Sequence, residues 1–297
     1  MRYRFVTCDV FTTRAFSGNQ LAVLADAGGL DDAQMQALAT EFNYSETTFV
    51  LPPADPANLA AMRIFTPRAE IPFAGHPTVG TALALAWAGR TPPSGDFVLE
   101  LKAGPVPVRV QAGQDGTPTA EFAAPKRPQH GPALVAEVVG RVLGLGPEDL
   151  VQGGGLPCVA SCGTPFALVE LSGIEALRRA HIGDHAGLSE IAGEGIFLFT
   201  RDGTSEPGEL RARMFAPLHG IPEDPATGSA AAALAGFLGG RPGLAEGWHC
   251  WRIHQGVEMG RPSLIQAAAH RVDGEVVEVR IGGSAVPVME GTVEVST

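Results

Sequence analysis

Three titratable residues, Glu46, His76 and Asp224, have types and surroundings that suit proton transfer. Glu46 opens a segment rich in β-formers, whereas His76 and Asp224 lie in Gly- and Pro-rich turns that run into segments of small residues. A carboxylate enclosed by apolar residues has its pKa raised toward neutrality, so it can take up a proton and return it. The three residues therefore predict general acid/base catalysis if the fold brings them together.

Taken singly, each residue has a plainer interpretation. Glu46 suits a solvated strand end, His76 suits a helix cap, and Asp224 suits an acidic turn shared with Glu223. Catalysis is favoured because two of them, His76 and Asp224, occur in a pair of similar segments.

The turns that contain His76 and Asp224 belong to two similar segments, residues 64–86 and residues 214–238. The first reads IFTPRAEIPFAGHPTVGTALALA and the second reads MFAPLHGIPEDPATGSAAAALAGFL. Each ends in a run that is apolar on nearly every side, which is typical of a helix buried inside a domain. The repeat predicts two related halves, each with a sheet wrapped round its own helix.

The two helices are expected to begin near Gly75-His76 and near Gly228-Ser229. A helix N-terminus has unpaired N–H groups and a partial positive charge, and glycine lets its backbone approach a ligand closely. If the halves face each other, the backbone at Gly75 and Gly228, together with Ser229, would bind the carboxylate of a small-molecule substrate.

The elements that must position Glu46 can be followed along the first half. Residues 3–10 and 20–25 alternate like strands, and Asp31 and Asp32 open a helix with apolar residues at i, i+3, i+4 and i+7. Residues 45–51 then form a strand that begins with Ser45 and Glu46. In the second half a strand, a helix at residues 174–180 and strands at residues 195–200 and 210–215 repeat this order.

The boundaries follow from the repeat and from a linker. Residues 123–132 contain three prolines and little apolar content, which predicts a linker between residues 1–125 and residues 126–281. Late strands are expected at residues 276–281 and 292–295. Residues 282–297 are expected to return to the first half.

Composition limits the function classes. There are 21 basic and 32 acidic residues, a net charge of −11, and no Lys/Arg-rich run, which argues against nucleic-acid or anionic-membrane partners. The longest apolar runs fall short of the roughly 20 residues of a membrane span. The N-terminus has a strand pattern rather than that of a signal peptide, so a cytoplasmic location is expected.

No nucleotide-binding fingerprint, P-loop or nucleophile elbow occurs, and no spacing of Cys and His completes a metal site, so neither a cofactor nor a metal is expected. One alternative is a racemase or epimerase with two thiolate bases, although none of the four cysteines lies in a repeat motif. Another is a catalytically silent binding or scaffold module.

Several segments together resemble the signature series of the phenazine-biosynthesis PhzF-like isomerases. They are residues 45–49 (SETTF), 65–67 (FTP), 72–77 (PFAGHP), 223–229 (EDPATGS) and 255–263 (QGVEMGRPS). The resemblance implies the α/β diaminopimelate epimerase-like fold, with two pseudo-symmetric domains, each a rolled, mostly antiparallel sheet around a central helix, and the active site in the cleft.

The resemblance also implies a homodimer without metal or organic cofactor. The substrate would be a cyclic amino acid or dihydroaromatic acid, in which a proton moves from one carbon to another. Glu46 would be the proton shuttle, with His76, Asp224 and Ser229 polarising the substrate and the backbone near Gly75 and Gly228 holding its carboxylate. Ser45 falls in the same signature series beside Glu46.

Overall fold

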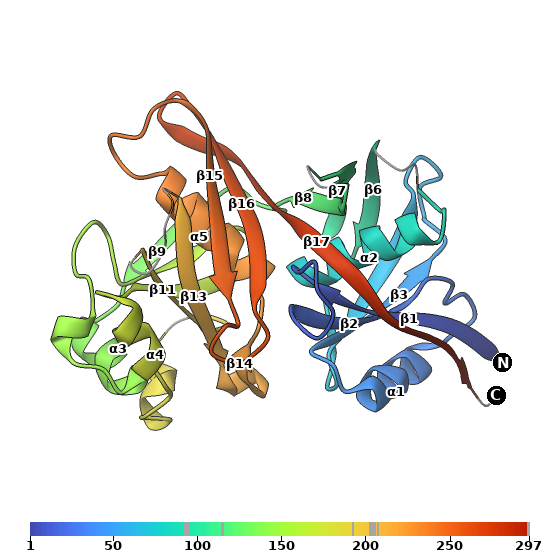
Figure 1. The fold of residues 1–297 in the computed structure, drawn as a ribbon, viewed down its shortest axis with the longest axis horizontal. Coiled ribbons are helices and arrows are strands. Elements are labelled where there is room, and N and C mark those ends of the chain that lie inside the picture. Colours follow the sequence, from blue (N-terminus) through green and yellow to red (C-terminus); the bar gives the residue numbers. More distant parts are fainter. Residues whose placement is uncertain (92–94, 114–115, 192, 202–205, 207, 296–297) are drawn as a thin grey trace. The chain divides into compact units, whose positions relative to one another are not determined.

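The computed structural model describes residues 1–91, 95–113, 116–191, 193–201, 206 and 208–295. Contacts within the chain define two compact units (Figure 1). Unit 1 comprises Met1–Pro125 and Gly282–Thr297, and unit 2 comprises Lys126–Ile281.

Unit 1 contains two α-helices among its strands. In chain order its elements are β1 (Arg2–Val10), β2 (Asn19–Leu24), α1 (Asp32–Phe42), β3 (Glu46–Leu51), β4 (Ala60–Phe65), β5 (Glu70–Ile71), α2 (Gly75–Trp87), β6 (Gly95–Leu101), β7 (Gly104–Ala112) and β8 (Pro118–Ala123).

Helix α1 begins where the sequence predicts. The Asp31 side chain accepts a hydrogen bond from the Gln34 N–H at 2.8 Å, and the Gln34 side chain accepts one from the Asp31 N–H at 3.1 Å, which completes a capping box. Asn43 ends the helix in the left-handed conformation, with φ of 53°. Met35 and Ala39 are buried, so the predicted apolar face is the one that packs.

The sheet of unit 1 mixes parallel and antiparallel pairs. β1–β2 is antiparallel, β2–β3 parallel, β3–β4 antiparallel, β4–β6 parallel, and β6–β7 and β7–β8 antiparallel. The long last strand β17 (Glu275–Glu294) pairs with both β1 and β8, the two ends of this series. Helix α2 packs against β1, β2, β3, β7 and β8, so the sheet wraps round it (Figure 1).

Helix α2 is buried from Gly75 to Leu85. Gly80 marks its closest approach to the sheet, because a Cβ atom there would lie 2.6 Å from Leu21 and 2.7 Å from Val10. A helix with no polar face is stable in water only when it is covered on all sides, and the rolled sheet provides that cover.

The elements of unit 2 begin with a strand and a helix that have no counterpart at the start of unit 1, and they then follow the order of unit 1. They are β9 (Gln129–Ala133), α3 (Ala136–Leu143), β10 (Cys158–Ser161), β11 (Pro165–Glu170), α4 (Ile174–Arg179), β12 (Ile196–Thr200), β13 (Glu209–Ala216), β14 (Ile221–Asp224), α5 (Gly228–Gly239), β15 (Gly247–Gln255) and β16 (Ser263–Val272), with 3₁₀ turns at Pro147–Asp149, Ala186–Glu190 and Pro217–His219.

The sheet of unit 2 repeats the pairing pattern of unit 1. β10–β11 is antiparallel, β11–β12 parallel, β12–β13 antiparallel, β13–β15 parallel and β15–β16 antiparallel. Helix α5 packs against β9, β10, β11, β15 and β16, and every residue of it except Ser229 is buried. The duplication seen in the sequence is therefore a duplication of topology.

The two halves also repeat a local packing arrangement at a hairpin. In unit 1 the Arg63 guanidinium lies 5.1 Å from the centre of the Phe65 ring and pairs with Glu70 at 2.8 Å. In unit 2 Arg213 lies 4.8 Å from the Phe215 ring and pairs with Glu223, also at 2.8 Å. A cation held over an aromatic face and beside a carboxylate fixes the hairpin that leads into each central helix.

Two details of the expected secondary structure are wrong. The predicted linker includes the first residues of β9, which pairs with β10. The expected strands at residues 276–281 and 292–295 are one strand, β17, because a register shift opposite Thr7 and Cys8 accommodates Pro287 within the ladder. This strand continues until Val295 exchanges two backbone hydrogen bonds with Met1.

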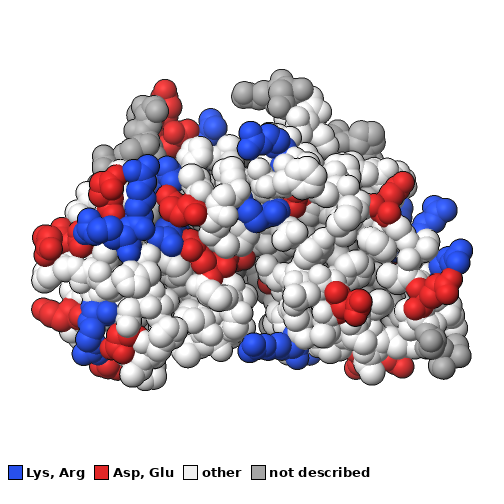
Figure 2. Space-filling model, turned by 60° about the horizontal axis from the view of Figure 1, so that its bottom comes forward, with Lys and Arg blue, Asp and Glu red and all other residues white. Residues whose placement is uncertain are grey.

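Charges of both signs are mixed on the face shown in Figure 2. Many are paired, as Arg141 is with Asp184 and Glu190. No helix in the described part of the chain is long and apolar enough to cross a membrane.

The close contact of α2 with the sheet at Gly80 predicts that replacing this residue with valine will overpack unit 1. We expect Gly80→Val to lower the free energy of unfolding by about 1–3 kcal/mol, since Val10 and Leu21 must move apart. Urea unfolding measures this. The control is Gly28→Val at a site whose nearest other atom is 3.9 Å from an added Cβ, and an equal loss in both variants would contradict the close contact.

Candidate functional site

The parallel pairing of β2 and β3 places their first residues at the same edge of the unit 1 sheet. Leu21 pairs with Glu46, so Asn19 at the start of β2 lies near Ser45 and Glu46 at the start of β3. The N-terminus of α2 brings His76 to the same edge. Three of the predicted site residues, Ser45, Glu46 and His76, are thereby brought together.

Glu46 and His76 are in contact inside unit 1. His76 Nε2 lies 3.4 Å from Glu46 Oε2, and the two residues are only 4% and 9% exposed. Nε2 has no hydrogen-bond partner among the residues whose placement is described, so the Glu46 carboxyl is the polar group it faces. Two of the titratable groups singled out from the sequence are therefore adjacent in the fold.

Burial lowers the pKa of His76 to about 3, and a hydrogen bond with the backbone of Gln20 opposes the shift only in part. The imidazole is therefore neutral at neutral pH. Its contact with Glu46 is that of a neutral ring with a carboxyl group rather than an ion pair.

Asn19 extends this cluster and was not singled out as a functional residue from the sequence. Its Nδ2 lies 3.3 Å from His76 Nδ1, and its Oδ1 accepts a hydrogen bond from the Ser45 hydroxyl at 3.3 Å. Asn19 is 1% exposed. Asn19 therefore links the Ser45 hydroxyl to the His76 imidazole.

The loop before Asn19 is held by a buried carboxylate. Asp9 on β1 accepts a hydrogen bond from the Phe16 N–H at 2.6 Å. Gly18 follows with φ of +66°, and a Cβ atom there would lie 2.3 Å from the Val10 carbonyl oxygen. Only glycine fits this position, and the resulting turn delivers Asn19 to the sheet edge.

In unit 2 a second polar cluster surrounds the turn before α5. The Thr227 hydroxyl donates a hydrogen bond to Asp224 Oδ2. Gln255, at the end of β15, donates from Nε2 to the Asp224 carbonyl at 2.8 Å and accepts at Oε1 from the Thr227 N–H at 3.1 Å. The sequence predicted Asp224 but not the role of Thr227 or Gln255, although both lie in the signature segments.

The starts of the two central helices agree with the sequence. α2 begins at Gly75 and α5 at Gly228, with half-buried Ser229 in the first turn. Neither N-cap residue, Ala74 or Thr227, caps its helix with a side-chain hydrogen bond in the described structure. The first-turn N–H groups are therefore not engaged by their own caps, which is what an anion-binding helix end requires.

Within the described ranges, no group of three or more His, Cys, Asp and Glu side chains could hold a metal ion.

The sequence matches the profile of the family described as phenazine biosynthesis-like protein over residues 8–291. The chain belongs to this family. It is 40% identical over 300 residues to an uncharacterized isomerase of Mesorhizobium japonicum, with 97% of each protein covered. It is 35% identical over 295 residues to the trans-2,3-dihydro-3-hydroxyanthranilate isomerase of Pseudomonas fluorescens, covering 98% of this chain and 99% of the relative.

The crystal structure of a PhzF-family phenazine biosynthesis protein from Bacillus anthracis has the same fold. It matches with a TM-score of 0.89 at 24% identity, covering 99% of this chain and 100% of that chain. The expected diaminopimelate epimerase-like fold is confirmed. This phenazine biosynthesis-like protein is an isomerase, as the resemblance implied.

The low pKa of His76 predicts an acid-sensitive fold. The ring binds its proton near pH 6.5 in the unfolded chain but only near pH 3 in the folded protein, so the unfolded state binds more protons between these values. Stability should therefore fall as the pH drops from 6.5 toward 3, with His76 contributing up to about 1.4 kcal/mol per pH unit.

Urea unfolding of the wild type and of His76→Gln between pH 6.5 and pH 4 measures this contribution. The variant should show a shallower loss of stability across the interval, after circular dichroism has established that it is folded. Parallel curves for the two proteins would show that His76 titrates normally in the folded state.

Proposed function

We propose that this isomerase moves a proton between two carbon atoms of a small carboxylate substrate, with Glu46 as the general acid/base. Glu46 in its ionised form would remove a proton from one carbon and return it to another, so that no atom is gained or lost. No metal or organic cofactor is required by this route.

The observation that carries the proposal is the buried contact between Glu46 and the neutral ring of His76. At 9% exposure, beside a ring that is itself uncharged, Glu46 is placed to take a proton from one carbon and return it to another. A held proton that exchanges with solvent before its return labels the substrate with deuterium in deuterated water.

The other predicted residues are assigned to substrate binding and polarisation. His76 and Asp224 would polarise the substrate, and Ser45 and Ser229 would contact it. The backbone N–H groups near Gly75 and Gly228 would bind its carboxylate, which the uncapped helix starts support.

The substrate class is inferred from the relatives. Since the chain is 35% identical to a trans-2,3-dihydro-3-hydroxyanthranilate isomerase, we infer a cyclic amino acid or a dihydroaromatic acid, in a biosynthetic process such as that of phenazines. We further propose that the protein acts as a homodimer in the cytoplasm, as expected from the sequence.

Glu46→Gln tests the assigned acid/base. The amide keeps the shape of the side chain but cannot carry the proton, so we expect the turnover rate to fall by about 10²–10⁴-fold. The assay follows deuterium incorporation from deuterated water into trans-2,3-dihydro-3-hydroxyanthranilate and a panel of cyclic amino acids by mass spectrometry.

Glu41→Gln is the matched control, because Glu41 is an exposed residue of α1, and it should exchange at the wild-type rate. Calorimetry checks that Glu46→Gln still binds the compound. Undiminished exchange in Glu46→Gln would remove Glu46 from the mechanism, and binding without exchange by the wild type would favour a silent binding module.

The state of the cysteines argues against the two-thiolate alternative. Burial raises the pKa of Cys8 and Cys158, and it raises that of Cys162 to about 12. A catalytic thiol needs a lowered pKa and access to the substrate. Cys162 instead donates a weak hydrogen bond to the Ala232 carbonyl at 3.3 Å, as a core residue does.

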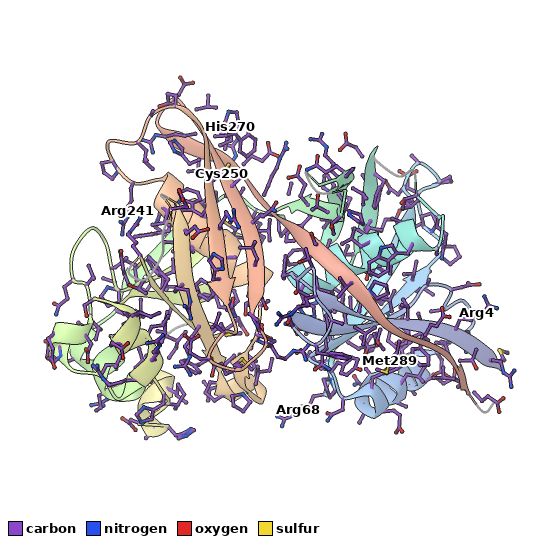
Figure 3. All side chains as sticks on the ribbon, viewed as in Figure 1. Arg4, Arg68, Arg241, Cys250, His270 and Met289 are labelled. Carbon is purple, nitrogen blue, oxygen red and sulfur yellow. The ribbon has the colours of Figure 1, made fainter. Side chains whose placement is uncertain are left out.

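Alkylation should therefore leave the activity unchanged. Cys250 on β15 is the exposed cysteine (Figure 3), so iodoacetamide should add one group to the folded protein. Mass spectrometry counts the adducts, and Cys250→Ser should remain unmodified. Loss of activity together with modification of Cys8, Cys158 or Cys162 would revive the thiolate mechanism.

A further inference from the structure

Gln255 has one possible orientation, and backbone groups fix it. The Thr227 N–H can only donate, so the atom that it meets at 3.1 Å is the Gln255 oxygen. The Asp224 carbonyl can only accept, so the atom that it meets at 2.8 Å is the Gln255 nitrogen. The side chain is 0% exposed, which leaves no room for water to take either place.

The orientation of Gln255 determines the direction of the next hydrogen bond. Its Nε2 also lies 3.1 Å from Thr227 Oγ1 and must donate to it. The Thr227 hydroxyl therefore accepts from Gln255, and its own hydrogen is directed to Asp224 Oδ2. Three side chains thus form a chain of hydrogen bonds with a single polarity, from the amide to the hydroxyl to the carboxylate.

The backbone holds Gln255 in place from the other side. Gly256 has φ of +72°, and a Cβ atom there would lie 2.6 Å from the Pro225 carbonyl oxygen and 2.5 Å from that of Arg261. The end of β15 therefore lies directly against the Asp224–Thr227 turn. A larger residue at position 256 could not leave Gln255 where it is.

Charged residues on the neighbouring strands form ion pairs with one another. On β13, Arg211 pairs with Glu258 and Arg213 with Glu223, while Glu209 lies 3.5 Å from Arg252 and His254 of β15. His249 of β15 bonds the Ala245 carbonyl, and α5 has no charged residue. The Thr227 hydroxyl is the donor that the turn itself directs to the Asp224 side chain.

We propose that Thr227 and Gln255 are positioning residues that hold Asp224 as an ionised hydrogen-bond acceptor. A donor at Oδ2 stabilises the charged carboxylate and fixes the rotation of its plane. Gln255 acts through Thr227, since it prevents the hydroxyl from turning its hydrogen away. The effect of these hydrogen bonds on turnover rests on the proposed function, whereas their effect on the Asp224 carboxylate does not.

Thr227→Val tests the proposal without substrate, because valine has the shape of threonine but no hydroxyl. The protein is labelled with ¹³C at the aspartate carboxyl carbons, and the Asp224 signal is identified by its absence in Asp224→Asn. We expect the titration midpoint of Asp224 to rise by about one pH unit in Thr227→Val and by less in Gln255→Leu. Thr227→Ser, which keeps the hydroxyl, should titrate within a few tenths of a pH unit of the wild type.

Thr81→Val is the matched control, since it removes a buried hydroxyl that lies 2.8 Å from Thr48 in unit 1. It should lose stability and leave the Asp224 midpoint unchanged. If Thr227→Val does not fold, Thr227→Ala is measured in its place. A wild-type midpoint in the hydroxyl-free variant, or an equal rise in Thr227→Ser, would overturn the proposal whatever the Glu46→Gln assay shows.

Discussion

The structure depends on covering two helices that have no polar face. α2 and α5 contain no Asp, Glu, Lys or Arg, and nearly every residue of each is buried. A sheet that rolls round such a helix covers its apolar sides, but the N–H groups of its first turn still need hydrogen-bond partners. Polar side chains lie near these helix starts, Glu46 and His76 in unit 1 and Asp224 in unit 2.

The two units meet this requirement with the same pairing order but with different side chains. In unit 1 an amide, Asn19, comes from β2, the strand directly before α1, and contacts an imidazole. In unit 2 an amide, Gln255, comes from the strand after α5 and contacts a turn. The duplicated scaffold thus holds a neutral imidazole in one half and a carboxyl group that accepts a hydrogen bond in the other.

The sequence could predict the elements and the titratable groups for a physical reason. Apolar periodicity and the repeated turns set the helix starts, and Glu46 and His76 stand at strand and helix boundaries where a side chain is easily recognised. Asn19, Thr227 and Gln255 could not be assigned in the same way, because their roles depend on hydrogen bonds across 57, 28 and 31 positions of the chain. The sequence also did not predict that β17 is continuous. Pro287 and the glycines near it indicate a break in a strand when the pairing with β1 is not known.

The path of β17 bears on how the protein folds during synthesis. Its residues from Gly282 onward complete the sheet of unit 1 beside β1, yet they leave the ribosome after all of unit 2. Unit 2 can close its own sheet while unit 1, although translated first, still has an open edge along β1. The half that carries Glu46 and His76 is thus completed only after the whole of unit 2 has been translated.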